Sequence, residues 1–431
     1  MKNDFINKLK GMKIEKYGDK LLFVLALAFL VLVIFRLWGN KPIRKTQVSP
    51  IVFTQWWEND SETEILKALI EEFESLHSGL KITLATQSYE DLRRDLFNSD
   101  LSTSLENAPP VNAALGDIIA LDPLWVTELL NKGIIENANA PLISFINVFY
   151  YNTGILREAG FSRPPKTRGE FLNYLRALSG GAENRTGLSG ASSPGLALGI
   201  NDSRGIYDDI FPWVWAAGAQ LVVDGKPTVN SRPVIESLSF LAALNSEGLI
   251  APAAFSANPE KLDDFVSGRA AFMVAPASEI GYVREHLGDD FGVTSIPAPD
   301  NYTGKSLLGS AGWTVGLYSG STHKEEAKLF IDFLAEKASF LTMGAGAGAM
   351  PVSGPTPKED DLYLKVWDIT IAGELAEDFS GLPWTELEEA FREELAAMFA
   401  GAMFGDAMFG ERSWPAEAAA AIQKKWEAIL E

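Results

Sequence analysis

The sequence predicts an α/β fold, and three consecutive segments carry that prediction. Ile51–Trp57 is a β-like run of apolar and aromatic residues, and Glu64–Leu76 places its apolar residues at helical spacing. Lys81–Ala85 is a second β-like run. A strand, a helix and a strand in this order are typical of a β-α-β unit with parallel strands. The chain has 431 residues, of which 47% are hydrophobic, which suits a folded protein of two or more lobes.

The first 45 residues differ from the rest in charge and hydropathy. They carry ten basic and three acidic side chains, although the whole chain has a net charge of −20. Leu21–Trp38 is an apolar run interrupted only by Arg36, near the lower length limit for crossing a bilayer. We expect residues 1–20 to be a cytoplasmic leader, 21–38 an uncleaved transmembrane anchor and 39–50 a linker. A cleavable signal peptide is the alternative, and whether the helix is cut stays open.

The anchor predicts a location. The chain would lie in the cell membrane as a single-pass protein, with its C-terminal body in the periplasm or outside the cell. The body is strongly acidic, so it repels nucleic acid, and we expect no nucleic-acid partner. The chain has no Cys, and its three His are far apart without metal-motif spacing. We therefore expect no metal and no cofactor.

Further strands and helices follow the first unit. The apolar run Leu142–Tyr151 stops at a turn, and Thr167 with Glu170 three residues later has the pattern of a helix cap. Val222–Asn230 reads as a hairpin with Asp-Gly at its turn. Ala270–Val274 is typical of a buried strand, and Lys324–Glu336 of an amphipathic helix. These elements continue the α/β pattern along the chain.

Six further segments occur along the chain in this order: IVFTQWW (51–57), YYNTGILREAGFSRPPKTRGEF (150–171), FPWVWAAGAQLVVDGKPTVNS (211–231), FVSGRAAFMVAP (265–276), FGVTSIPAPDNYTGKSLLGSAGWTVGL (291–317) and HKEEAKLFIDFL (323–334). This ordered set resembles the extracellular solute-binding protein family 1, the sugar-type binding proteins of ABC importers, which are maltose-binding-protein-like. The resemblance covers about residues 50–431. It implies a two-lobed, periplasmic-binding-protein-like (type II) fold with a hinge. On this basis we expect lobe one to comprise residues 50–141 and 262–308, and lobe two residues 142–261 and 309–431.

The resemblance also implies where a ligand would bind. In this family aromatic rings stack on sugar faces and polar groups bind the hydroxyls. The ligand-binding candidates at matching positions are Trp56, Trp57, Asp117, Trp213, Trp215, Glu279, Trp313 and Trp384, with Glu386 as a further polar candidate. For each Trp, core packing is the alternative reading, since tryptophans are usually largely buried. For each acid, the alternative is a solvated surface carboxylate.

The function implied by the resemblance is capture, not catalysis. The chain would be the extracytoplasmic substrate-binding component of an ABC importer, closing on a mono- or oligosaccharide and delivering it to permease subunits. An alternative is a membrane-anchored sensor or interaction protein that kept the fold and lost transport. That alternative is favoured by Ile134–Leu142, because the family has a longer segment there. A glycan-cleaving enzyme is the third reading, and no pair of acids is marked for it by the sequence.

Overall fold

The computed structural model describes residues 50–57, 60–97, 115–139, 141–180, 195–256, 260–338, 361–404 and 414–431. Residues 50–431 belong to one compact unit. The expected leader, anchor and linker lie almost wholly before this unit, outside the described residues. Among the residues described, no helix is long and apolar enough to cross a membrane.

In the part of the chain that the structure describes, nine strands form the main sheet, in the order β2-β1-β3-β12-β5-β9-β6, with β10 paired to β5 and β4 paired to β12. Their bounds are β1 (Ile51–Gln55), β2 (Ile82–Thr86), β3 (Ile118–Leu121), β4 (Ile135–Ala138), β5 (Ile143–Asn152), β6 (Gly195–Ala197), β9 (Ala270–Pro276), β10 (Phe291–Thr294) and β12 (Ser310–Tyr318). Among the described residues, two short pairs are separate from this sheet, namely β7 (Val222–Val223) with β8 (Lys226–Pro227), and β11 (Leu307–Leu308) with β13 (Glu374–Leu375).

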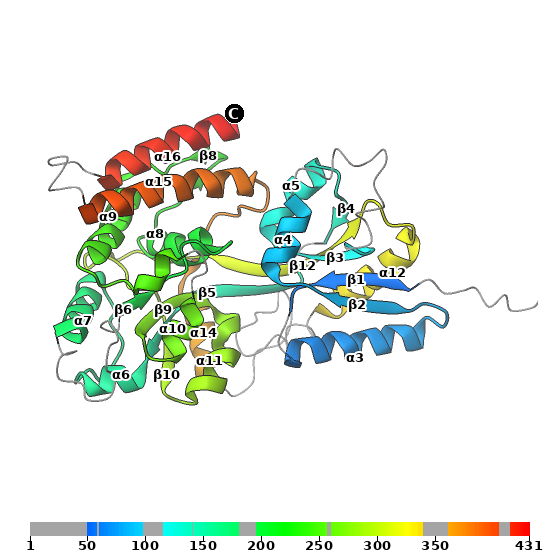
Figure 1. Cartoon of the computed structure of the whole chain (residues 1–431), viewed down its shortest axis with the longest axis horizontal. Helices are drawn as coiled ribbons and strands as arrows, with labels where there is room; N and C mark the ends of the chain where they lie inside the picture. Colours follow the sequence, from blue (N-terminus) through cyan, green and yellow to red (C-terminus); the bar gives the residue numbers. More distant parts are fainter. Residues whose placement is uncertain are drawn as a thin grey trace, which may run out of the picture. The chain divides into compact units, whose positions relative to one another are not determined.

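The helices pack around these strands. The first group is α3 (Asp60–Leu76), α4 (Tyr89–Phe97), α5 (Val126–Asn131), α6 (Thr153–Glu158), α7 (Arg168–Gly180), α8 (Phe211–Trp215) and α9 (Arg232–Ser246). The second group is α10 (Lys261–Val266), α11 (Ile280–Leu287), α12 (Lys324–Glu336), α14 (Asp361–Ala372), α15 (Trp384–Phe404) and α16 (Trp414–Leu430). Figure 1 shows α15 and α16 side by side over α9. Shorter turns are η4 (Pro123–Trp125), the π-helical η6 (Ile206–Ile210), η7 (Pro252–Phe255) and η8 (Ala277–Glu279).

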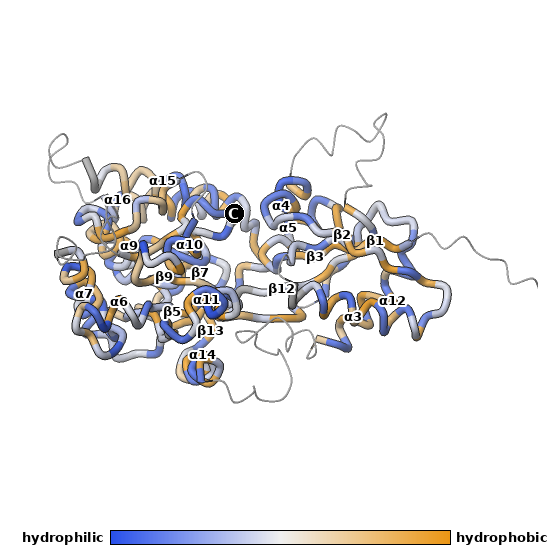
Figure 2. Tube along the Cα trace, turned by 60° about the horizontal axis from the view of Figure 1, so that its bottom comes forward, coloured by the Kyte–Doolittle hydropathy of each residue, from blue (hydrophilic) through white to orange (hydrophobic). Residues whose placement is uncertain are grey.

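The β-α-β unit is confirmed. β1 and β2 pair in parallel from Ile51 with Ile82 to Gln55 with Thr86, and α3 connects them. The apolar face of α3 is buried with that of α12: Phe73 meets Phe330 edge to face at 4.9 Å between ring centroids. Figure 2 shows hydrophobic and hydrophilic stretches alternating along both helices, as helical spacing of apolar residues predicts.

Two predicted local structures are also found. The hairpin is the β7–β8 pair, and its turn residues Asp224 and Gly225 have positive φ of 50° and 73°, as a tight hairpin turn requires. Thr167 caps α7, because its Oγ1 accepts from the backbone N–H of Glu170 at 3.3 Å. The Glu170 carboxylate accepts from the N–H of Lys166 instead of that of Thr167, so only half of a capping box forms.

Strand pairing and helix packing divide the body into two lobes, although one apolar cluster contains residues of both, such as Trp125 and Trp384. Lobe one contains β1–β4, α3–α5, α12 and the second half of β12. Phe53, Phe73 and Phe330 belong to one apolar cluster of this lobe. Lobe two contains β5, β6, β9, β10, α6–α11 and α14–α16. β5 and β12 connect the lobes, since Ser310–Trp313 pairs with Ile143–Ile146 and Thr314–Leu317 pairs with β3. These two strands therefore connect the lobes.

The lobe boundaries differ from those expected for residues 262–308 and 309–431. β9 and β10 both pair with β5, so residues 262–308 lie with lobe two. α12 packs on α3 and β12 pairs with β3, so the start of 309–431 lies with lobe one. β9 is buried from Ala270 to Ala275, as expected of a strand whose two faces are both covered, and its two edges pair with β5 and β6.

Candidate functional site

Three side chains of lobe one gather at the carboxyl edge of its parallel strands. Trp56 follows β1, Tyr89 begins the helix after β2, and Asp122 follows β3 directly. The strands β1, β2 and β3 are parallel, so these residues share one edge. Open α/β sheets bind ligands at this edge. The rings of Trp56 and Tyr89 meet edge to face at 5.5 Å.

Hydrogen bonds hold the Asp122 carboxylate in place at the turn between β3 and η4. One carboxylate oxygen accepts from the N–H of Leu124 at 3.0 Å and caps η4, where Pro123 begins the turn. The other accepts from the Tyr89 hydroxyl at 2.7 Å. Burial, together with the Asp122 charge, raises the pKa of Tyr89 well above its usual value. Tyr89 therefore acts only as a neutral hydrogen-bond donor to this carboxylate.

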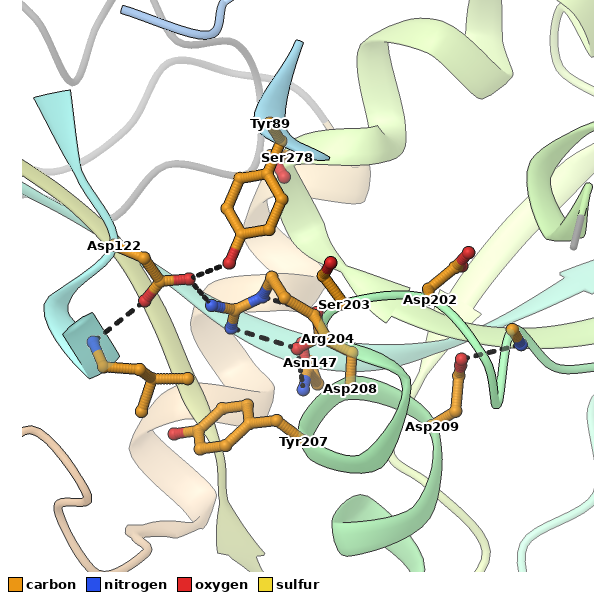
Figure 3. Close-up of polar contacts among 12 residues, drawn as sticks. Tyr89, Asp122, Asn147, Asp202, Ser203, Arg204, Tyr207, Asp208, Asp209 and Ser278 are labelled. Carbon is orange, nitrogen blue, oxygen red and sulfur yellow. Dashed lines mark hydrogen bonds and ion pairs between the residues drawn. The ribbon is translucent and has the colours of Figure 1, made fainter. Parts of the chain in front are cut away.

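Arg204 of lobe two joins Asp122 across the lobes. Its Nη1 donates to Asp122, and its Nε donates to Asp208 at 2.8 Å. Figure 3 shows the guanidinium between the two carboxylates, with Tyr89 above and Tyr207 below. Burial alone would lower the pKa of Arg204, but the two carboxylates hold it well above its ordinary value. The result is a permanently charged bridge between the lobes.

The loop that presents Arg204 is held by close backbone packing. A side chain at Gly205 would place its Cβ 2.7 Å from the carbonyl oxygen of Ile200, and backbone cannot move aside easily. The chain then enters η6, which carries Asp208 and Asp209. Single π-helical turns occur often at functional sites. Here the turn keeps both acids in the interior, at 5% and 0% exposure.

Further polar contacts cross between the lobes nearby. The Ser203 hydroxyl donates to Glu90 on α4. Arg93, one turn later on α4, donates to Glu388 on α15 at 2.8 Å. Glu388 also accepts from Arg392 at 2.8 Å. Burial raises the pKa of Glu388 to about 7, although Arg93 and Arg392 oppose the shift.

Within lobe two, further polar contacts hold the turn η6, which follows the loop that presents Arg204. Lys261 donates to Asp209 at 2.8 Å, and Asp209 also accepts from the N–H of Gly199 at 2.8 Å. Burial raises the pKa of Asp209, with the Lys261 charge opposing. Asn147 on β5, 1% exposed, donates to Asp208 at 3.1 Å. The site is thus rich in charge and is bonded to β5, one of the strands that connect the lobes.

The tryptophans expected to stack on a ligand lie mostly in the cores. Trp213, Trp215, Trp313 and Trp384 are 0 or 1% exposed, and Trp57 is 7% exposed. Trp57 stacks on Trp313 at 4.6 Å inside the core of lobe one. The structure therefore favours the packing alternative for these five rings. Trp56 is half-buried and lies at the site.

The three acidic candidates lie on separate elements, at the amino end of β3, in η8 and at the start of α15. Asp117 precedes β3 and lies at the amino edge, where it accepts from the N–H of Val52 at 2.8 Å and the hydroxyl of Ser321 at 2.7 Å. The acid at the carboxyl edge of β3 is Asp122 instead. Glu386 is exposed, whereas Glu388, two residues later, is the buried acid. Glu279 in η8 is half-buried, and burial raises its pKa while the charge of Lys261 opposes the shift.

Other site residues were missed by sequence reasoning, although their sequence contained a signal. Each is a polar residue within or directly after an apolar run. They are Asn147 in LISFINVFYY, Asp122 after IIAL, and Asp208 with Asp209 in GIYDDIFPW. A polar side chain that a strand or helix buries needs a partner, and here the partners are one another. Arg204 and Arg93 gave no such signal.

The model of the bacterial extracellular solute-binding protein family matches residues 59–339. A Deinococcus radiodurans relative named "Probable ABC transporter-binding protein" is 26% identical over 233 residues, 52% of this chain and 54% of the relative. The melibiose/raffinose/stachyose-binding protein MelE of Bacillus subtilis is 25% identical over 361 residues, 79% of this chain and 82% of MelE. The alignment with a Brucella abortus binding protein spans 62% of that relative, so these first relatives are matched over part of their length.

Solved structures share the fold. Maltose-bound MalE3 of T. maritima has a TM-score of 0.65 at 19% identity, covering 88% of this chain and 99% of MalE3. The GacH receptor of Streptomyces glaucescens has a TM-score of 0.64 at 18% identity, covering 88% of this chain and 98% of that receptor. The two-lobed type II fold is therefore shown by these likenesses, which extend over nearly the whole body.

Proposed function

The chain belongs to the bacterial extracellular solute-binding protein family, and on that premise we propose that it captures a carbohydrate between its lobes and delivers it to the permease subunits of an ABC importer. Proteins of this family bind solutes and are not enzymes. The observation that carries the proposal is the polar cluster at the carboxyl edge of β1 and β3, to which both lobes contribute. The mechanism is closure about the β5–β12 hinge.

The proposed ligand contacts come from the exposed and half-buried members of this cluster. Trp56 and Tyr89 offer an aromatic edge, and Asp202, Glu279 and Glu90 offer acceptors for hydroxyl groups. Opening the hinge would separate Arg204 from Asp122 and Arg93 from Glu388. A ligand that replaces part of these contacts would be held by both lobes at once, which is how lobe closure is coupled to binding.

The anchored sensor that lost transport is not favoured. It was motivated by the short segment Ile134–Leu142. In the structure that segment supplies β4, which pairs with β12 from Gly316 opposite Ala138 to Tyr318 opposite Ile135. The short connection therefore adds a strand beside β12 in lobe one, and Arg204 still bonds Asp122 across the lobes.

A saccharide is expected to stabilise the protein against heat. At a free concentration one hundred times its dissociation constant, a bound ligand adds about 2.7 kcal/mol to the unfolding free energy. The measurement is thermal melting of the full chain in mild detergent, against mono- and oligosaccharides with amino acids as controls. A shift with saccharides alone supports the proposal. If no saccharide changes the melting temperature, the carbohydrate role is wrong.

We also propose that Leu21–Trp38 anchors the protein in the membrane, with the body outside the cytoplasm. The full chain is expected in the membrane fraction, released by detergent and not by high salt or carbonate. A matched control replaces Leu25 and Leu30 with Arg, because a charge at the centre of a span costs about 2.5–3.5 kcal/mol per residue. Release of the unsubstituted chain by carbonate would show that the segment does not span the membrane.

A further inference from the structure

Helix α4 of lobe one bonds lobe two through two side chains of one face. Glu90 and Arg93 lie three residues apart on this helix, so they are neighbours on its surface. Glu90 accepts from the backbone N–H of Ser203 at 3.3 Å and also from the Ser203 hydroxyl. Arg93 donates to the Glu388 carboxylate on α15 at 2.8 Å. Both ends of this helical face are therefore attached to the other lobe.

A further contact lies on the next helix of lobe one. The Thr127 hydroxyl on α5 donates to the carbonyl of Ser380, in the segment that leads into α15. Trp125 in η4 and Trp384, the first residue of α15, belong to the apolar cluster that contains residues of both lobes. Figure 1 shows the start of α15 turned toward α4 and α5. We call these contacts the α4–α15 clasp, and its polar members are Glu90, Arg93, Thr127, Ser203, Ser380 and Glu388.

The lobe-two side of the clasp is held together within its own lobe. Arg392, one turn after Glu388 on α15, donates to the Glu388 carboxylate at 2.8 Å and to the Asp202 carbonyl at 2.9 Å. It also donates to the carbonyl of Ile200. One guanidinium thus connects α15 to the loop that carries Ser203. When the lobes separate, Glu388 keeps a cation, so opening does not leave a buried charge without a partner.

Arg93 is the charged member whose bond depends on the position of lobe one. Its side chain is 21% exposed, and that of its partner Glu388 is 2% exposed. Hydrogen bonds between charged groups are stronger than neutral ones, and the burial of Glu388 limits the screening by water that weakens surface pairs. Each polar contact of the clasp joins two residues of the chain directly. Its formation therefore does not require a bound solute.

We propose that the α4–α15 clasp holds the two lobes closed before a solute binds, and that it acts as an autoinhibitory contact on solute entry. In a binding protein that is open when empty, lobe closure follows from the solute's preference for the closed form. Here the clasp favours that form already, and a solute enters only when the clasp opens. The apparent affinity is then reduced by the fraction of molecules that are open. This inference goes beyond solute capture and does not depend on which solute is bound.

Two spin labels, one on each lobe, measure closure without any solute. The chain has no Cys, so Asn131→Cys on α5 and Lys424→Cys on α16, both at exposed positions, would carry the only labels. Pulsed electron paramagnetic resonance gives the distance between them in the full chain in detergent. The measurement is made at pH 8, because burial raises the pKa of Glu388 to about 7. We expect one short distance in this labelled parent chain.

Arg93→Gln in the labelled chain should add a longer distance. The expected rise in the open-to-closed ratio is about tenfold or more, since a hydrogen bond between charged groups is removed. Arg94→Gln is the matched control, because Arg94 is the next residue on α4 and pairs with Asp91 and Asp95 of the same helix. It should leave the distance unchanged. Glu388→Gln should open the lobes as Arg93→Gln does, and combining the two should add little, as expected of partners in one contact.

Three results would show that the clasp does not hold the lobes: a long distance in the parent chain, no lengthening by Arg93→Gln, or equal lengthening by Arg94→Gln. Should Arg93→Gln and Glu388→Gln fail to fold by thermal melting, Thr127→Val removes one hydroxyl of the clasp, whereas Thr127→Ser keeps the bond to Ser380. A longer distance with Val and not with Ser supports the proposal, and the same distance in both contradicts it. Saccharide capture stands or falls separately, by the melting measurement with saccharides.

Discussion

Replacing Arg204 with Ala is expected to lower the free energy of unfolding by about 3 kcal/mol, the lower end of what breaking a buried ion pair costs. The loss arises because two buried carboxylates would remain without the cation that they share. Asp122 and Asp208 are 2% and 5% exposed and would lose their common cation. Arg204 also stacks over Tyr207, with its guanidinium carbon 5.2 Å from the ring centroid, and this contact would be lost as well.

Denaturant unfolding measures this loss, and Arg232→Ala is the matched control. Arg232 also pairs with an acid four residues away, but its side chain is 89% exposed, so its removal should change the unfolding free energy by less than about 0.5 kcal/mol. Adding Asp122→Asn and Asp208→Asn to Arg204→Ala should restore part of the stability, since the uncompensated charges are removed. A loss below 1 kcal/mol for Arg204→Ala would mean that water reaches these carboxylates.

The sequence predicts the local elements of this fold but not the pairing of distant strands. Apolar periodicity identifies β1, α3 and β2 and the hairpin turn, because local spacing decides them. The partition into lobes depends on which strand pairs with which, over separations such as that between Phe149 and Val274 in the β5–β9 pair. The local sequence pattern does not specify which distant strands pair. For this reason the lobe expected for residues 262–308 differs from the one indicated by the pairing of β9 and β10 with β5.

The same limit applies to the site. The sequence does not show whether Trp213 and Trp384 pack in a core or stack on a ligand, because an aromatic ring suits both a core and a sugar face. Burial decides between these roles, and burial arises from distant elements such as α15 lying over α8 and α9. By contrast, Asp122 could be expected once the end of β3 is fixed at Leu121, since the site is at the carboxyl edge. Asp117, at the other end of the same strand, could not serve it.

Trp384→Ala should therefore behave as a core mutation, with a loss of about 3–5 kcal/mol in unfolding free energy. The ring is 1% exposed and meets Tyr207, Phe211 and Phe379 at centroid distances of 5.6, 6.0 and 5.4 Å. No small side chain can fill that space, because all three neighbours are fixed by other contacts. The Tyr207 hydroxyl, for example, donates to the Ser310 carbonyl at 3.0 Å.

Trp56→Ala is the variant that separates packing from recognition. Trp56 is half-buried, and its ring contacts Tyr89 and Trp125 at the edge of lobe one. We expect a smaller loss of stability than for Trp384→Ala and a larger loss of ligand affinity. Unfolding and calorimetric binding, measured on both variants, give the two quantities. If Trp384→Ala unfolds normally yet loses the ligand, the ring reaches the ligand in an open form of the hinge, and core packing is not its main role.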